Sequence, residues 1–176
     1  MFWLKFIVNF IKILREGQTP TQVAGGFALG SILGLSPMLT LQGVLVWLII
    51  LVLDVNLSAA TFSLGLFAMI AFIFDPVFHR LGYFLLVNVD SLKGLYTALY
   101  NAPIAPLTRF NNTVVMGSFV SAFILFLPIY FGMKKFVIAY RATLGVRMQK
   151  MKVYQLIDRS AIVQWYKRIR DIGGVL

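Results

Sequence analysis

The chain of 176 residues contains no cysteine and one histidine, and it has few acidic side chains. The lack of cysteine excludes a disulfide framework, a thiolate nucleophile and a cysteine-ligated metal, and it leaves the redox compartment unspecified. One histidine and six Asp or Glu residues, with no paired metal-binding motif, leave few groups for acid–base or metal chemistry. We therefore expect no enzyme activity, no cofactor and no metal site.

Charged residues of both signs are scarce, at 12% of the chain, whereas 60% of the residues are hydrophobic. Soluble globular domains carry about 25% charged residues and are less apolar. The composition therefore predicts an all-α integral membrane protein. The net charge of +10 could suggest nucleic acid, but most Lys and Arg residues follow Met133, directly beyond a hydrophobic segment. This placement favours a cytoplasmic membrane face and anionic lipid headgroups, and we expect no nucleic-acid partner.

Two prolines interrupt the apolar stretch from Val23 to Val89. Ser36-Pro37 and Asp75-Pro76 divide it into pieces that are mostly shorter than the about 20 residues a helix needs to cross a bilayer. Proline donates no backbone hydrogen bond and disfavours helical geometry in the residue before it. We therefore predict a membrane core over residues 19–89, built of two helical hairpins that break at Pro37 and Pro76.

A capping box marks the start of the first of these helices. Thr19 is the expected N-cap, Pro20 takes the first helical position and Gln22 the third. Small residues then recur every four positions, which gives one smooth face where another backbone can approach closely: Gly26, Gly30 and Gly34. We interpret this face as a helix-packing surface, and a role in transport is the alternative.

One cluster of ionisable residues lies inside the core: Asp75, His79 and Arg80. Such residues are costly at membrane depth and usually face a partner or water. On a helix that begins just after it, Asp75 would be the N-cap, and Arg80 could pair with it in a purely structural role. The alternative is recognition of a lipid headgroup or another anion, for which the planar guanidinium is suited. Thr40 and Gln42 follow the first break and could contact the same ligand or satisfy freed backbone groups.

The remaining regions have simpler interpretations. Residues 1–18 predict an amphipathic interfacial helix rather than a signal peptide. Residues 90–113 predict a polar loop, and residues 114–133, which carry no charge, predict the clearest transmembrane helix. Residues 134–176 predict a basic, amphipathic cytoplasmic tail that contacts anionic lipid, with docking to a protein partner as the alternative.

Basic residues near both ends predict that both termini lie in the cytoplasm, so the number of membrane crossings should be even. Residues 114–133 supply one crossing. The stretch from Val23 to Val89 should then supply an odd number, which two simple re-entrant hairpins cannot. One hairpin and one crossing helix, from Leu57 to Phe74, would satisfy this rule.

The core from Thr19 to Val89 resembles a bacterial membrane family known as domain of unknown function 2062. The matching motifs are Ala24-Gly25-Gly26-Phe27-Ala28-Leu29-Gly30, Gly34, Pro37, Leu41-Gln42-Gly43, Asn56 and Asp75-Pro76. The family usually has Asn-Pro at the last of these. The resemblance implies a multi-pass protein of the bacterial inner membrane that works in the cell envelope, where some relatives accompany large envelope proteins or enzymes of cell-surface glycans.

Three functions are compatible with this sequence. The first is a small inner-membrane component that handles phospholipid, alone or docked to a larger periplasmic lipid-transport partner. The second is a structural anchor or assembly subunit of an envelope complex. The third, a membrane enzyme of lipid or glycan metabolism, has the fewest chemical groups to support it. The broken helices and the charged cluster favour the first hypothesis.

Overall fold

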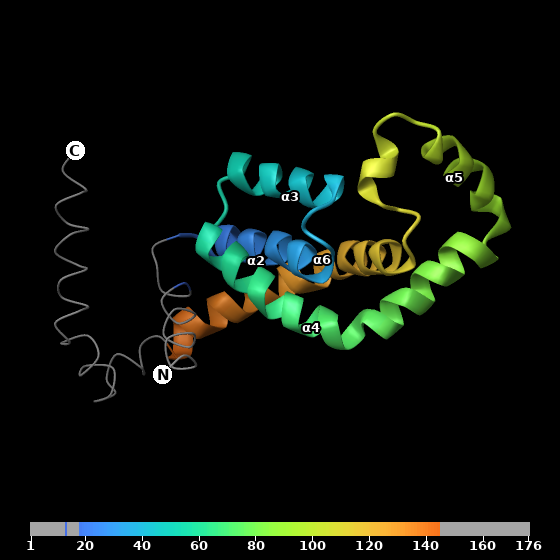
Figure 1. Ribbon diagram of the computed structural model, residues 1–176. Coiled ribbons are helices and arrows are strands. Elements are labelled where there is room, and N and C mark those ends of the chain that lie inside the picture. Colours follow the sequence, from blue (N-terminus) through green and yellow to red (C-terminus); the bar gives the residue numbers. More distant parts are fainter. Residues whose placement is uncertain (1–12, 14–17, 145–176) are drawn as a thin grey trace. The chain divides into compact units, whose positions relative to one another are not determined.

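The computed structural model describes Ile13 and residues 18–144. The elements of these residues are all helical, as predicted, and no strand occurs among them. Figure 1 shows their arrangement, and the longer helices are α2 (Pro20–Leu35), α3 (Leu41–Val52), α4 (Leu57–Tyr83), α5 (Lys93–Tyr100) and α6 (Thr113–Ala139). Short helical turns join or extend them: η1 (Phe84–Asn88), η2 (Asp90–Leu92), η3 (Ala105–Thr108) and η4 (Tyr140–Leu144).

The chain divides into two compact units, Met1–Val137 and Ile138–Leu176. The first unit contains the helices from α2 to the greater part of α6, and the described part of the second contains the end of α6 and η4. The interfacial helix predicted for residues 1–18 and most of the predicted tail lie outside the described residues.

The start of α2 has the predicted capping box. Thr19 Oγ1 accepts a hydrogen bond from the Gln22 N–H, and Gln22 Oε1 accepts one from the Thr19 N–H at 2.8 Å. Gln22 also reaches the next connection, because its Nε2 donates to Asp54 Oδ2 at 2.6 Å and its carbonyl accepts from the Asn56 N–H at 3.0 Å. Asn56 in turn caps α4. The two helices therefore begin side by side.

The glycine face of α2 packs against α4. A Cβ atom at Gly26 would overlap the backbone of Asn56, and one at Gly30 would overlap the backbone of Ala60. At Gly34 a Cβ atom would meet the carbonyl oxygen of Leu64 at 2.6 Å. Along this contact the residue numbers of α2 and those of α4 increase in the same direction, so the two helices run parallel.

The first proline break divides α2 from α3. The backbone N–H and the hydroxyl of Ser36 both bond to the carbonyl of Ile32, which closes the last turn of α2. Thr40 then caps the start of α3. The two helices and the turn at Pro37 form a hairpin, which Figure 1 shows in blue and cyan.

The prediction of a second hairpin, broken at Pro76, is wrong. α4 continues through Asp75-Pro76 to Tyr83, so Asp75 is a residue of the helix interior and is not an N-cap. Proline removes one backbone hydrogen bond and bends a helix, but packing on both sides can hold the helix together. Ala60 packs on α2 before the proline and Phe78 packs on α6 after it, and Figure 1 shows α4 bent along its length.

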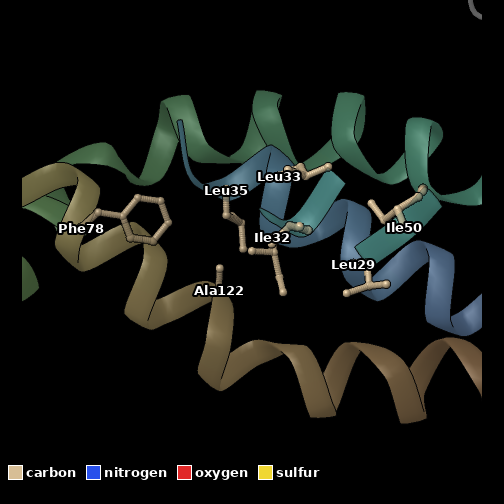
Figure 2. Close-up of a cluster of buried hydrophobic side chains, with 9 residues drawn as sticks. Leu29, Ile32, Leu33, Leu35, Ile50, Phe78 and Ala122 are labelled. Carbon is tan, nitrogen blue, oxygen red and sulfur yellow. The ribbon is translucent and has the colours of Figure 1, made fainter. Parts of the chain in front are cut away.

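A close crossing joins the end of α4 to the start of α6. Cβ atoms at Gly82 and Gly117 would overlap the backbone oxygens of Thr113 and Phe78 respectively, so the two backbones touch there. Beside this crossing lies the hydrophobic core. Figure 2 shows how its side chains converge from α2, α3, α4 and α6, the labelled ones being Leu29, Ile32, Leu33, Leu35, Ile50, Phe78 and Ala122.

Two stretches are long and apolar enough to cross a membrane, Leu57–Asn88 and Thr113–Ala142, and α3 is a shorter apolar helix. Many large apolar side chains on these helices are exposed, such as Phe72 on α4 and Phe123 on α6. The predicted polar loop over residues 90–113 contains α5 and η3 and exposes apolar side chains of its own.

Candidate functional site

The predicted charged cluster lies on the second half of α4, where Asp75, His79 and Arg80 are all exposed. The expected ion pair between Asp75 and Arg80 does not form. Residues on a helix face one another at spacings of three and four, and these two are five apart on a continuous helix. Among the described residues, a salt bridge instead joins Lys93 to Asp90 at 2.6 Å, after the end of α4.

The surroundings of Asp75 are strongly apolar. Phe72 is 82% exposed and Ile73 is 72% exposed, and Phe74 and Val77 are also exposed. Two charged groups without an ion pair thus stand at the end of an outward apolar surface. This arrangement can hold a ligand that has both a charged group and an apolar part.

His79 contributes to the crossing of α4 and α6. Its Nδ1 lies 2.7 Å from Thr113 Oγ1, and its ring centroid lies 6.3 Å from that of Tyr83. The hydrogen bond joins the two helices one turn from the Gly82–Gly117 contact. His79 therefore has a structural partner that the sequence did not indicate.

Thr40 and Gln42 do not join the charged cluster. Thr40 is buried, donates to the Pro37 carbonyl at 2.8 Å and accepts from the Gly43 N–H at 3.4 Å, which makes it a helix cap. Gln42 Nε2 donates to the carbonyl of Thr108 at 3.0 Å, and its Oε1 is buried with no partner among the described residues. Gln42 thereby ties the start of α3 to η3.

The sequence interpretation missed two residues at the contact between α3 and η3, Thr108 and Arg109. Thr108 is 66 positions from Gln42, and no local pattern links them. Arg109 follows with φ of 54°, in the left-handed region, and its carbonyl accepts from the Asn112 N–H at 3.0 Å. Pro106 and Asn112 are typical turn residues, but they do not show which residue takes the left-handed conformation.

The described residues offer little for metal chemistry. No three His, Cys, Asp or Glu side chains among them lie close enough together to hold a metal ion. What they do offer is a free carboxylate and a free guanidinium on an apolar helix. Groups of this kind bind by charge and hydrogen bonding.

Comparisons with known proteins give one family and one distant relative. A family model described as "Uncharacterized protein conserved in bacteria (DUF2062)" matches residues 5–143. An "Uncharacterized protein" of Treponema pallidum (strain Nichols) is 27% identical over 159 residues, which cover 90% of this chain and 98% of that protein. No solved structure gave a significant match.

Proposed function

The chain belongs to the bacterial family DUF2062, and we propose that it is an integral protein of the inner membrane that handles phospholipid. The observation that carries this proposal is the outward face of α4 and α6. Large apolar side chains such as Phe72 and Phe123 point away from the core, where a soluble protein would place polar groups. A surrounding bilayer would cover them.

The charges at the helix ends support the same placement. Residues 57–74 of α4 carry no charge and span about 27 Å at 1.5 Å per residue, close to the about 30 Å of a hydrocarbon core. Asp75 follows at one end. On α6 the charge-free part ends at Lys134 and Lys135, about 30 Å from Thr113. Both helices thus have charged residues at the levels expected for headgroups.

The hairpin of α2 and α3 would be re-entrant in this membrane. α2 packs in parallel along α4 as far as Ala68, about two thirds of the way along the charge-free part. The chain then turns at Pro37 and returns as α3. Two crossings and one hairpin keep both ends of the chain on the same side, as the distribution of basic residues requires.

Arg80 and Asp75 are the groups that we assign to lipid headgroups, and because they lie on different faces of α4 each would contact a different lipid. Arg80 can donate hydrogen bonds to a phosphate, and Asp75 can accept one from an ammonium group. The exposed Phe72 and Ile73 are positioned for the acyl chains of these lipids. Binding here would serve lipid transport in the envelope, by this protein alone or beneath a periplasmic partner.

Replacing Arg80 with alanine should weaken phospholipid binding by about ten- to a hundredfold, since charge-assisted hydrogen bonds contribute about 1.5–3 kcal/mol. Native mass spectrometry of the protein in mild detergent would measure the bound fraction against added phospholipid. Arg80→Lys keeps the charge and should retain part of the binding. Thr61→Ala, at the other end of α4, removes an exposed hydroxyl that bonds to the first turn of its own helix; it is the control and should bind as the parent does.

The same variants separate transport from anchoring. Arg80→Ala and Asp75→Ala should reduce phospholipid transport in cells, while protein levels and recovery of any envelope partner stay unchanged. Normal lipid binding and transport in both variants would contradict the proposed site. A stable envelope partner recovered together with that result would instead support the structural anchor.

A further inference from the structure

The connection between α4 and α6 carries an unexpected apolar surface. No charged residue occurs from Gly94 to Thr108. Four large side chains of this segment are more than half exposed: Leu95 at 54%, Tyr100 at 63%, Ile104 at 60% and Leu107 at 62%. We call these four residues the connection surface. Exposed apolar side chains in such number mark a place where something other than water makes contact.

Contacts within the chain hold the connection close to the helix bundle. The Tyr96 hydroxyl donates to the Leu85 carbonyl at 3.3 Å, and the rings of Tyr96 and Phe110 stack with centroids 6.0 Å apart. At the other end of the connection, the Gln42–Thr108 hydrogen bond holds η3 to α3. The connection therefore folds back toward the helices and does not extend into solvent.

The place of the connection in the fold indicates which part of the membrane surrounds it. It joins the two ends that the Gly82–Gly117 crossing brings together, which are the ends marked by Asp75 and Arg80. If α4 and α6 cross the bilayer, this is the membrane face opposite the start of α4 and the end of α6. The hydrogen bonds to Leu85 and Gln42 hold the connection near this face, where the lipid headgroups would lie.

The composition of the segment also fits a bilayer interface. Lys93 precedes the uncharged stretch and Arg109 follows it, and Tyr96 and Tyr100 lie between them. Tyrosine and basic residues are enriched where a membrane meets water, with apolar side chains inserted below.

We propose that the connection surface inserts into the outer leaflet of the inner membrane, at the boundary between headgroups and acyl chains. This inference rests on the proposed membrane insertion of α4 and α6. It assigns a lipid-embedded role to a segment whose sequence predicted a polar loop. Arg109 would then contact lipid phosphate from the water side of the same boundary.

Spin labels can test this placement because the parent chain has no cysteine. Single variants Ile104→Cys and Leu107→Cys would be labelled with a nitroxide in vesicles of phosphatidylethanolamine and phosphatidylglycerol. Collision rates with oxygen, which concentrates in lipid, and with a water-soluble nickel chelate report the depth of each label. Both positions are exposed, so labelling should leave the fold intact.

Two further variants provide reference values for the collision rates, one in water and one in the hydrocarbon core. Asp90→Cys lies at the start of the same connection with a side chain that is 83% exposed, and it should report water. Phe123→Cys lies on the outward face of α6 and should report the hydrocarbon core. We expect nickel collision rates at Ile104→Cys and Leu107→Cys to be several-fold lower than at Asp90→Cys, at a depth of about 5–10 Å.

The outcomes distinguish the two proposals. Labels at Ile104→Cys and Leu107→Cys that are as open to nickel as Asp90→Cys would overturn the insertion of the connection surface. Labels shielded from both oxygen and nickel would overturn it as well, because a protein partner or a second copy would then cover the surface. Nickel access at Phe123→Cys would overturn the membrane placement of α6 itself.

Discussion

Replacing Gly30 with alanine should destabilise the protein by about 3 kcal/mol, at the upper end of the effects of overpacking. The added Cβ atom would overlap the carbonyl oxygen of Ala60 and would lie 2.8 Å from the carbonyl carbon and the Cα atom of that residue. All three atoms belong to the backbone of α4, so no side chain can move aside. The two helices would have to separate along their whole parallel contact.

Thermal unfolding in mild detergent, followed by circular dichroism, would measure this loss. Gly65→Ala is the matched control, because it makes the same change in α4 at a glycine where the added methyl group would have no neighbour within 4 Å. Alanine favours a helix over glycine by up to about 1 kcal/mol, so this control should be neutral or stabilising. Equal losses of stability in the two variants would show that α2 and α4 do not pack through the glycine face.

The second large effect is expected at the crossing of α4 and α6. In Gly117→Ala the new methyl group would overlap the Phe78 carbonyl oxygen and lie 2.9 Å from the Gly82 nitrogen. Gly82→Ala would meet the Thr113 carbonyl carbon at 2.6 Å. Either change forces the same two backbones apart, so each should cost about 3 kcal/mol. The hydrogen bond between His79 and Thr113 should be lost with them.

Because both substitutions open the same contact, their effects should not add. The double variant should lose clearly less stability than the sum of the single losses, as expected for residues that touch. Unfolding of the four proteins in the same detergent would give the coupling free energy. Gly132→Ala, also on α6 but with open space around it, should be neutral or stabilising, like Gly65→Ala. Simple additivity would indicate that the crossing is not formed.

The two proline dipeptides show which part of this fold local sequence can predict. After Pro37 the chain has Thr40, whose hydroxyl caps a new helix, so the break is accompanied by a start signal. No such residue follows Pro76, and the chain continues as α4. The proline dipeptide therefore predicted a break correctly only where a helix-start residue follows it. In the second, the contact of Phe78 with α6 outweighs the local preference, and that contact is a tertiary one.

The candidate site shows the same difference between what local sequence predicts and what tertiary contacts decide. Asp75 and Arg80 were found from their charge in an apolar stretch, but their predicted pairing depended on a helix that started at Pro76. The continuous helix places them on different faces. The glycine face of α2 was recognised from the spacing of its glycines, whereas the sequence did not show that α4 would pack against it. The contact of Gln42 with Thr108 joins segments that no periodicity relates.

The parallel packing of α2 and α4 has an electrostatic consequence. Helices that lie side by side in the same direction bring their N-termini together, and each N-terminus carries a partial positive charge of about +0.5. Asp54 lies two residues before the Asn56 cap of α4 and is held to the first turn of α2 by Gln22. Its carboxylate therefore stands beside both helix starts and offsets the repulsion between two like dipole ends.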